Sequence, residues 1–265
     1  MLKDITIGQH YPVNSIIHKL DSRVKLIATF IFMISLFIIN KFWPYSIILL
    51  SLISVIKLSN IPIKYILKGL KPLRWIILFT FVLNIFFLPG DTLWSFGFMK
   101  ITSQGLEQAI FMAIRLILLV VGTSLLTLTT SPMELTDGIE RLLKPFENIG
   151  MPVHELAMMM TIALRFIPTL LDETDKIMKA QMSRGADFES KNIVNRAKSL
   201  VPLLVPLFVS AFRRATELAT AMEARCYRGG YNRTKMKEAI MTKSDYISAI
   251  ILIIYLVVII VTRFI

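Results

Sequence analysis

The feature that most constrains this chain is a series of long apolar runs. Five of them lie at residues 24–40, 42–56, 73–88, 106–129 and 246–264. A membrane-spanning helix needs about 17 to 25 mostly apolar residues, which is close to the length of these runs. With 55% hydrophobic residues and a mean hydropathy of +0.64, the chain is also too apolar for a soluble domain of 265 residues. We therefore predict an integral membrane protein.

The distribution of positive charge predicts how these runs cross the membrane. Segment 57–74 carries five Lys or Arg residues and no acid, and such segments stay on the cytoplasmic side. If the first two runs are separate spans joined at Asn40 and Lys41, the basic amino terminus lies on that same side. We therefore expect four spans within residues 1–130 and a cytoplasmic amino terminus. A fifth span within 244–265 would end outside the cell.

Residues 131–243 form a block of mixed charge, with 17 Lys or Arg and 13 of the 18 acids of the chain. Two apolar stretches lie within this block, but an arginine and three prolines interrupt them. We expect a cytoplasmic domain partly sunk in the membrane interface, with a re-entrant hairpin as the alternative. Its three long helices are expected at about 132–148, 152–184 and 192–227. The predicted fold class is thus an all-α integral membrane protein, with about five transmembrane helices and this additional domain.

Several kinds of catalytic or metal-binding chemistry are missing from the sequence. It has no phosphate-binding loop of the Gly-x-x-x-x-Gly-Lys-Ser/Thr type and no constellation typical of a catalytic nucleophile. A single cysteine and three scattered histidines offer no metal-ligand spacing. The net charge of +12 suits anionic lipid headgroups, and no basic run stands apart from an apolar segment. We expect a non-enzymatic chain that binds no metal, cofactor or nucleic acid.

Two arginines lie at the expected ends of the second and third long helices, each between two small residues. We call these triplets the first tip and the second tip; they are Ser183-Arg184-Gly185 and Ala224-Arg225-Cys226. A guanidinium group offers a rigid fork of donors, which suits a groove lined with carboxylates and carbonyls. The alternative is that each arginine only interacts with the negative end of its own helix. Because two such ends recur, we interpret them as two docking points on one face.

Other residues in the block suit packing between helices or contact with a partner. They are the alanines Ala211, Ala215 and Ala219, the prolines Pro202 and Pro206, and the methionines Met158, Met159 and Met160. Small residues at intervals of four let a second helix approach closely, although alanine is also simply a good helix former. Methionines either adapt to different partners or fill gaps in a core. Within the spans, Arg115 is either functional, paired with a polar group of a neighbouring helix, or extended towards the membrane surface.

The region 128–233 resembles the EcfT family, the transmembrane subunits of energy-coupling factor transporters, a group that also includes the cobalt-transport subunit CbiQ. The segments that carry this resemblance are Thr129-Thr-Ser-Pro132, Gly150-Met-Pro152, Ala163-Leu-Arg-Phe-Ile-Pro168, Ala180-Gln-Met-Ser-Arg-Gly-Ala-Asp187, Pro202-Leu-Leu-Val-Pro206 and Ala221-Met-Glu-Ala-Arg-Cys-Tyr-Arg-Gly-Gly230. The spans match that family in number and placement.

The resemblance implies a scaffold in a bacterial cell membrane that links two ATPase subunits to a substrate-binding S component. In that family the arginine triplets end coupling helices and dock into grooves on the ATPases, which hold ATP and Mg²⁺. Ser183 and Cys226 depart from the commoner Ala-Arg-Gly form. The implied function is uptake of vitamins or other micronutrients, with a dedicated cobalt, nickel or biotin system as the alternative. A stand-alone secondary transporter or channel and a membrane-bound enzyme are the remaining rivals.

Overall fold

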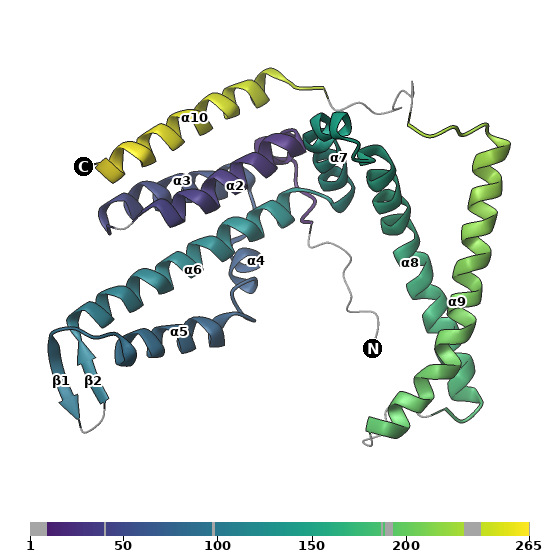
Figure 1. Cartoon of the computed structure of the whole chain (residues 1–265), viewed down its shortest axis with the longest axis horizontal. Helices are drawn as coiled ribbons and strands as arrows, with labels where there is room; N and C mark the ends of the chain where they lie inside the picture. Colours follow the sequence, from purple (N-terminus) through teal and green to yellow (C-terminus); the bar gives the residue numbers. More distant parts are fainter. Residues whose placement is uncertain are drawn as a thin grey trace. The chain divides into compact units, whose positions relative to one another are not determined.

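The computed structural model describes residues 10–39, 41–96, 99–186, 188, 193–230 and 240–264. Within that part of the chain almost all regular structure is helical (Figure 1). The described residues divide into two compact units. The first unit takes Gly8–Gly138 and Glu238–Ile265, and the second unit takes Ile139–Lys237. The all-α fold class is confirmed.

Each of the five predicted spans is one helix of the first unit, with ends within a few residues of the expected ones. The helices are α2 (Ser22–Ile38), α3 (Trp43–Ser59), α5 (Arg74–Phe87), α6 (Ser103–Thr129) and α10 (Lys243–Phe264). The separation of α2 from α3 has a local cause, because Pro44 lies in the first turn of α3, where its missing N–H and fixed φ suit a helix start. Two shorter helices, α1 (Ile16–Lys19) and α4 (Ile63–Lys68), flank them.

Length and composition make four helices of the described chain candidates for crossing a membrane. They are α6, α10, α8 (Val153–Ser183) and the part Ser199–Ala224 of α9 (Ile193–Ala224). The helices α3 and α5 are apolar but shorter. Since α8 and α9 pass the same criterion as α6, composition alone does not place them in the cytoplasm. That placement, and the side on which each terminus lies, stay predictions.

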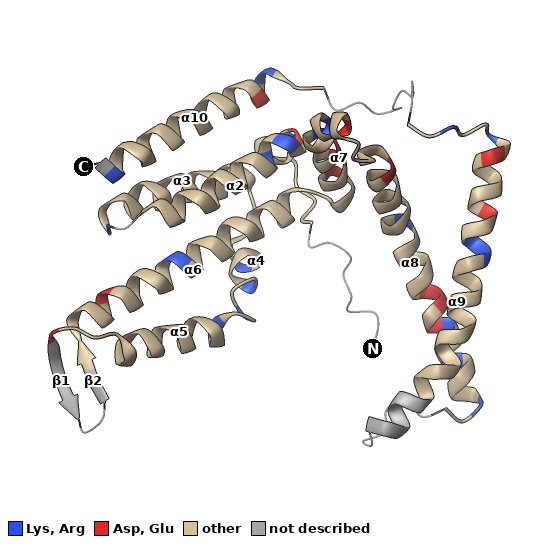
Figure 2. Ribbon diagram, in the orientation of Figure 1, with Lys and Arg blue, Asp and Glu red and all other residues tan. Residues whose placement is uncertain are grey.

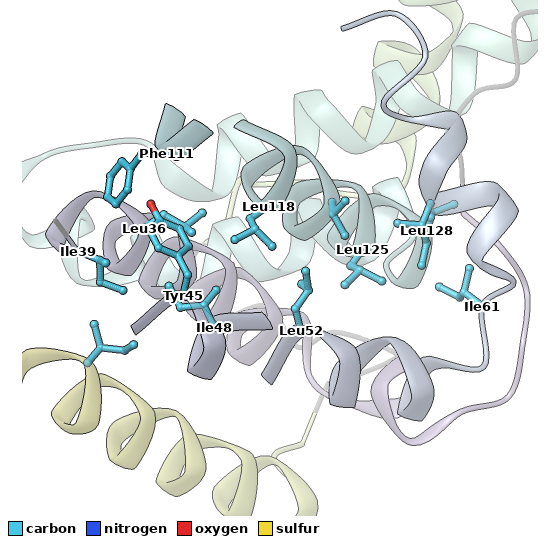
Figure 3. Close-up of a cluster of buried hydrophobic side chains, with 13 residues drawn as sticks. Leu36, Ile39, Tyr45, Ile48, Leu52, Ile61, Phe111, Leu118, Leu125 and Leu128 are labelled. Atoms are coloured by element: carbon cyan, nitrogen blue, oxygen red, sulfur yellow. The ribbon is translucent and has the colours of Figure 1, made fainter. Parts of the chain in front are cut away.

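The core of the first unit is apolar and is centred on α6. Leu118 and Leu125 of α6 lie against Leu36 of α2 and Ile48 of α3 in one buried cluster (Figure 3). Ile259 of α10 belongs to the same cluster. Ile66 of α4 also belongs to it, so the described part of this unit has five helices that share one core.

Arg115 pairs with groups at the junction of α2 and α3. Its Nη2 donates to the carbonyl of Ile39, which ends α2, at 3.0 Å, and its Nε donates to the Tyr45 hydroxyl at 3.3 Å. The guanidinium also lies over the ring of Phe111, 4.8 Å from its centroid. Carbonyls at a helix end lack partners within the helix, so Arg115 satisfies one of them. This confirms the interpretation that Arg115 pairs with a polar group of a neighbouring helix.

A polar cluster joins α10 to α2 inside the first unit. Asp245 is only 1% exposed, and its Oδ1 accepts the backbone N–H of Asp21 at 2.8 Å. Its Oδ2 accepts the N–H of Thr242 at 2.7 Å, before the first turn of α10. Nearby, the Lys25 ammonium donates to the carbonyl of Thr129, the last residue of α6, at 3.1 Å. These bonds satisfy buried polar groups that would otherwise destabilise the unit.

The loop between α5 and α6 contains a hairpin that the sequence interpretation did not predict. Strands β1 (Thr92–Phe96) and β2 (Met99–Thr102) pair antiparallel. The two strands contain aromatic and β-branched residues, which favour extended structure. Each strand has only four or five residues, too few for its pattern to stand out in the sequence between the long apolar runs.

Two of the three long helices predicted between 131 and 243 end earlier than expected. The first, α7, covers Pro132–Leu143 and is followed by the 3₁₀ helix η1 (Lys144–Ile149). Pro145 explains the change, because proline removes an α-helical hydrogen bond. The third, α9, ends at Ala224 rather than at residue 227 because Cys226 takes a left-handed conformation with φ of 55°. The second, α8, has the predicted bounds to within one residue.

Candidate coupling site at two helix ends

The first tip follows the last residue of α8, Ser183. Arg184 is the capping residue, and Gly185 is left-handed with φ of 89°. The Gly185 N–H donates to the carbonyl of Met182 at 3.0 Å, and the Ala186 N–H donates to the carbonyl of Gln181 at 3.0 Å. Two crossed bonds around a left-handed residue define a Schellman motif, which ends a helix sharply.

The second tip has the same backbone arrangement at the end of α9. Cys226 stands at the left-handed position, its N–H donates to the carbonyl of Glu223 at 2.9 Å, and the Tyr227 N–H donates to the carbonyl of Met222 at 3.0 Å. Arg225 is therefore the capping residue, as Arg184 is at the first tip. The two tips are two copies of one local structure, although the first has glycine where the second has cysteine.

Both arginines are exposed, as are the small residues on either side of them. Within the described residues, no carboxylate lies within ion-pair distance of Arg184 or Arg225. Open space surrounds Gly185, since a methyl group placed there would touch nothing within 4 Å. Each tip is thus a narrow cationic end free to enter a groove. An arginine at a helix carboxyl end also stabilises its own helix through the helix dipole, and this stabilisation is compatible with docking into a groove.

The two tips lie at opposite ends of the α8 and α9 pair, and the expectation that they dock on one face stays a prediction. Figure 1 shows α8 ending where α9 begins its course and α9 ending at the far end of the pair. The segment after the second tip contacts the first turn of α8, because Gly230 lies against the ring of His154. Antiparallel neighbours necessarily carry their carboxyl ends to opposite ends of the pair.

A polar contact fixes the crossing of α8 and α9. Glu173 of α8 accepts hydrogen bonds from the Ser210 hydroxyl and from the Arg214 guanidinium, the latter at 2.8 Å. Ser210 is 6% exposed, so the contact lies inside the helix pair. Figure 2 shows further charged residues spaced along both helices. The Glu173 contact sets which turn of α9 meets which turn of α8, and hence where each tip stands.

A second contact holds the segment that follows the second tip. The Nδ1 atom of His154 lies 3.1 Å from a carboxylate oxygen of Glu140, at the end of α7. The Cδ2 edge of that ring lies next to Gly230, so closely that a side chain on Gly230 would overlap it. His154 therefore connects α7, α8 and the chain leaving the second tip.

Most of the other predicted residues are exposed in the part of the chain that the structure describes. Ala215 and Ala219 are exposed, as are Pro202 and Pro206, and α9 continues through both prolines. The remaining alanine and methionines divide between half-buried and exposed positions; Ala211 and Met158 are half-buried, and Met159 and Met160 are exposed. The alanine stripe is thus not the main surface between α8 and α9, and its use by a partner helix stays a prediction.

Sequence reasoning missed the residues that position the tips. Glu173 and Ser210 gave a weak signal, because each is a polar residue in or beside an apolar stretch. His154 and Gly230 gave none, since they are far apart in sequence and meet only in the folded unit. Among the described residues, no group of three or more His, Cys, Asp or Glu could hold a metal ion.

Comparison with known proteins gives the family. A family model described as "Cobalt transport protein" (CbiQ) matches residues 13–236. The "Energy-coupling factor transporter transmembrane protein EcfT" of Thermosediminibacter oceani is 62% identical over 92% of this chain and 92% of its own length. The protein of that name from Ruminiclostridium cellulolyticum is 57% identical over 97% of this chain and 96% of its length, and that from Bacillus subtilis is 51% identical over 92% and 93%.

These relatives are transmembrane subunits of transporters and not catalytic enzymes. They match nearly the full length of the chain, and the residues 13–236 that the family model matches include both tips. The chain therefore belongs to the CbiQ/EcfT family of energy-coupling factor transporter transmembrane proteins.

Proposed function

We propose that the chain is the scaffold of an ATP-driven importer in a bacterial cell membrane, linking two ATPase subunits to a substrate-binding S component. The observation that carries the proposal is the repetition of one Schellman-capped, exposed arginine at the ends of α8 and α9. ATP and Mg²⁺ would be bound by the ATPases, and this chain would receive their movement. Its amino terminus would be cytoplasmic and its carboxyl terminus outside.

The separation of the tips supports two ATPases rather than one. From the contact between Glu173 and Arg214, each helix runs a further ten residues, about 15 Å, to its own tip. The helices are antiparallel, so the two tips are too far apart to share one small groove. Each arginine would donate to acids or carbonyls of one ATPase, and a charged hydrogen bond of this kind contributes about 1.5 to 3 kcal/mol. Closure of the ATPases would then move both ends of the helix pair together.

An exposed apolar face on α9 supports contact with the S component. It is formed by Val201, Val205, Phe208, Val209 and Phe212, each between 57% and 71% exposed. Their spacing puts them on one side of α9, whereas Leu203 and Ser210 on another side are buried. A contiguous apolar surface of this kind marks a site for a protein or a membrane.

The proposed cargo is a vitamin or another micronutrient. A dedicated cobalt, nickel or biotin system is the second candidate, because the matching family model carries a cobalt-transport description. Ten of the 14 methionines lie between residues 131 and 243, which favours a surface that adapts to several S components. Purification in mild detergent followed by identification of the bound S components would separate a shared system from a dedicated one.

The single cysteine of the chain tests the docking of the second tip directly. Cys226 is exposed and adjoins Arg225, so a maleimide reagent should modify it in the isolated chain. Adding the purified ATPases should block that modification, and Arg225→Glu should restore it. Arg228→Glu is the matched control, since it reverses a nearby exposed charge outside the triplet. Equal labelling with and without the ATPases would contradict the proposal.

Transport provides the second test. We expect the double substitution Arg184→Glu and Arg225→Glu to abolish uptake while the chain still inserts into the membrane. Normal uptake by this variant would remove the assigned role of the arginines. A stand-alone channel or secondary transporter, in contrast, would carry substrate when the purified chain alone is placed in vesicles.

A further inference from the structure

A groove runs along α5 and α6 of the first unit. It has a volume of about 350 Å³ and is lined by Leu70, Arg74, Ile77, Leu78, Phe81, Ala113 and Ile117. The α5 residues lie at intervals of three and four, so they form one stripe of that helix. Every lining residue except Arg74 is apolar.

The two sides of the groove come from an antiparallel helix pair. Gly69, before α5, lies against Ser124 near the end of α6, and Gly105 near the start of α6 lies against Asn84 near the end of α5. Leu70 and Arg74 therefore mark one end of the groove, and Phe81 and Ala113 lie further along it. The charge stands at the end next to the basic segment 57–74.

The charged end suits an anionic headgroup. Arg74 is exposed, and its guanidinium lies over the ring of Trp75, 5.3 Å from the centroid. In the part of the chain that the structure describes, no carboxylate pairs with Arg74. The segment 57–74 adds four lysines and no acid. Tryptophan and arginine side by side are typical of the headgroup level of a membrane, where Lys and Arg attract anionic lipids.

We propose that this groove binds one anionic phospholipid, with an acyl chain along Ile77, Phe81 and Ala113 and the phosphate at Arg74. The shape and the charge point to the same ligand. An apolar groove accepts a flexible hydrocarbon chain, and the single guanidinium among its lining residues would bind the phosphate. A transmembrane helix of another protein would fill the apolar part but would leave Arg74 without an anion. The bound lipid would fill the space between α5 and α6.

Native mass spectrometry of the purified full-length chain, titrated with dioleoyl-phosphatidylglycerol or dioleoyl-phosphatidylcholine, tests the proposal. We expect one phosphatidylglycerol to bind more tightly than phosphatidylcholine, and Arg74→Gln to weaken its binding about fivefold. Lys64→Gln is the matched control, because it removes a charge of the same segment that does not line the groove. Ala113→Phe should fill the groove and prevent binding while Arg74 is intact, which keeps the test decisive if Arg74→Gln misfolds.

Three outcomes would overturn the proposal. They are equal binding of the two lipids by the unaltered chain, unchanged phosphatidylglycerol binding in both Arg74→Gln and Ala113→Phe, and an equal loss in Lys64→Gln. A photo-crosslinker at position 78 that joined a protein subunit of the assembled transporter, rather than lipid, would also overturn it. Since the titration uses neither ATPases nor transport, its result is independent of the proposed coupling.

Discussion

Cys226 holds a backbone conformation that most side chains avoid. Its φ of 55° is left-handed, and for an L-residue other than glycine this conformation is unfavourable by roughly 1 to 2 kcal/mol. The first tip has Gly185 at the equivalent position, where no such penalty arises. The second tip therefore forms the same motif with a less suitable residue.

Replacing Cys226 with glycine should stabilise the chain. The free energy of unfolding should rise by about 1 kcal/mol, because the left-handed strain is removed. The greater freedom of glycine in the unfolded state offsets part of the gain. Thermal unfolding of the purified chain in detergent measures it. Ser183→Gly is the opposite control, because Ser183 is the last residue of a helix and its replacement should destabilise by about 0.5 to 1 kcal/mol. Destabilisation by Cys226→Gly would contradict the assigned conformation.

Gly230 is expected to tolerate no side chain while His154 is present. A methyl group there would overlap the imidazole ring, so Gly230→Ala should destabilise the chain by about 1 to 3 kcal/mol. It should also change the maleimide reactivity of Cys226, since the segment after the second tip must move.

The double variant Gly230→Ala with His154→Ala provides the control. Removing the ring makes space for the methyl group, so Gly230→Ala should have a smaller effect in the His154→Ala background. Additive effects on unfolding and unchanged labelling would show that the two residues do not constrain each other.

At the scale of helices, periodicity and charge predicted most of what the structure contains. The bounds of α2, α3, α5, α6, α8 and α10 follow from apolar runs bounded by Pro, Gly or charge. The errors lie where a local backbone effect competes with the pattern. Pro145 turned the end of the first predicted helix into η1, and Cys226 ended α9 early. The β-hairpin was missed because each strand is only four or five residues long.

The crossing of α8 and α9 should depend on Glu173. Replacing it with glutamine removes the ion pair with Arg214 while keeping the shape, so we expect lower thermal stability and a changed distance between spin labels at the two tips. Arg213→Gln is the matched control. It breaks the Arg213–Glu217 pair, whose atoms are 3.8 Å apart and whose side chains are 71% and 69% exposed. Exposed pairs contribute little, so an equal loss in both variants would contradict the role of Glu173.

At the scale of the whole molecule, we expect the two tips to act as independent binding sites, because they lie at opposite ends of the helix pair. Arg184→Glu should remove one of the two ATPase sites, Arg225→Glu should remove the other, and the double substitution should remove both. Isothermal titration with purified ATPases should therefore show two ATPases bound to the unaltered chain, one to each single variant and none to the double variant. Loss of one charged contact of about 1.5 to 3 kcal/mol weakens a site by roughly tenfold or more. Release of both ATPases by either single substitution would show that the tips act as one site.

The sequence alone determined the class of the protein, its helices and the two arginine triplets. These are local properties: apolar length, charge sign, and small residues around an arginine all act within a few turns of one helix. Tertiary structure decided where the triplets lie. The antiparallel course of α8 and α9 separates the tips, Glu173 sets their crossing, and His154 holds the segment beyond the second tip. Those contacts join residues 37 or more positions apart, and no pattern within one helix specifies them.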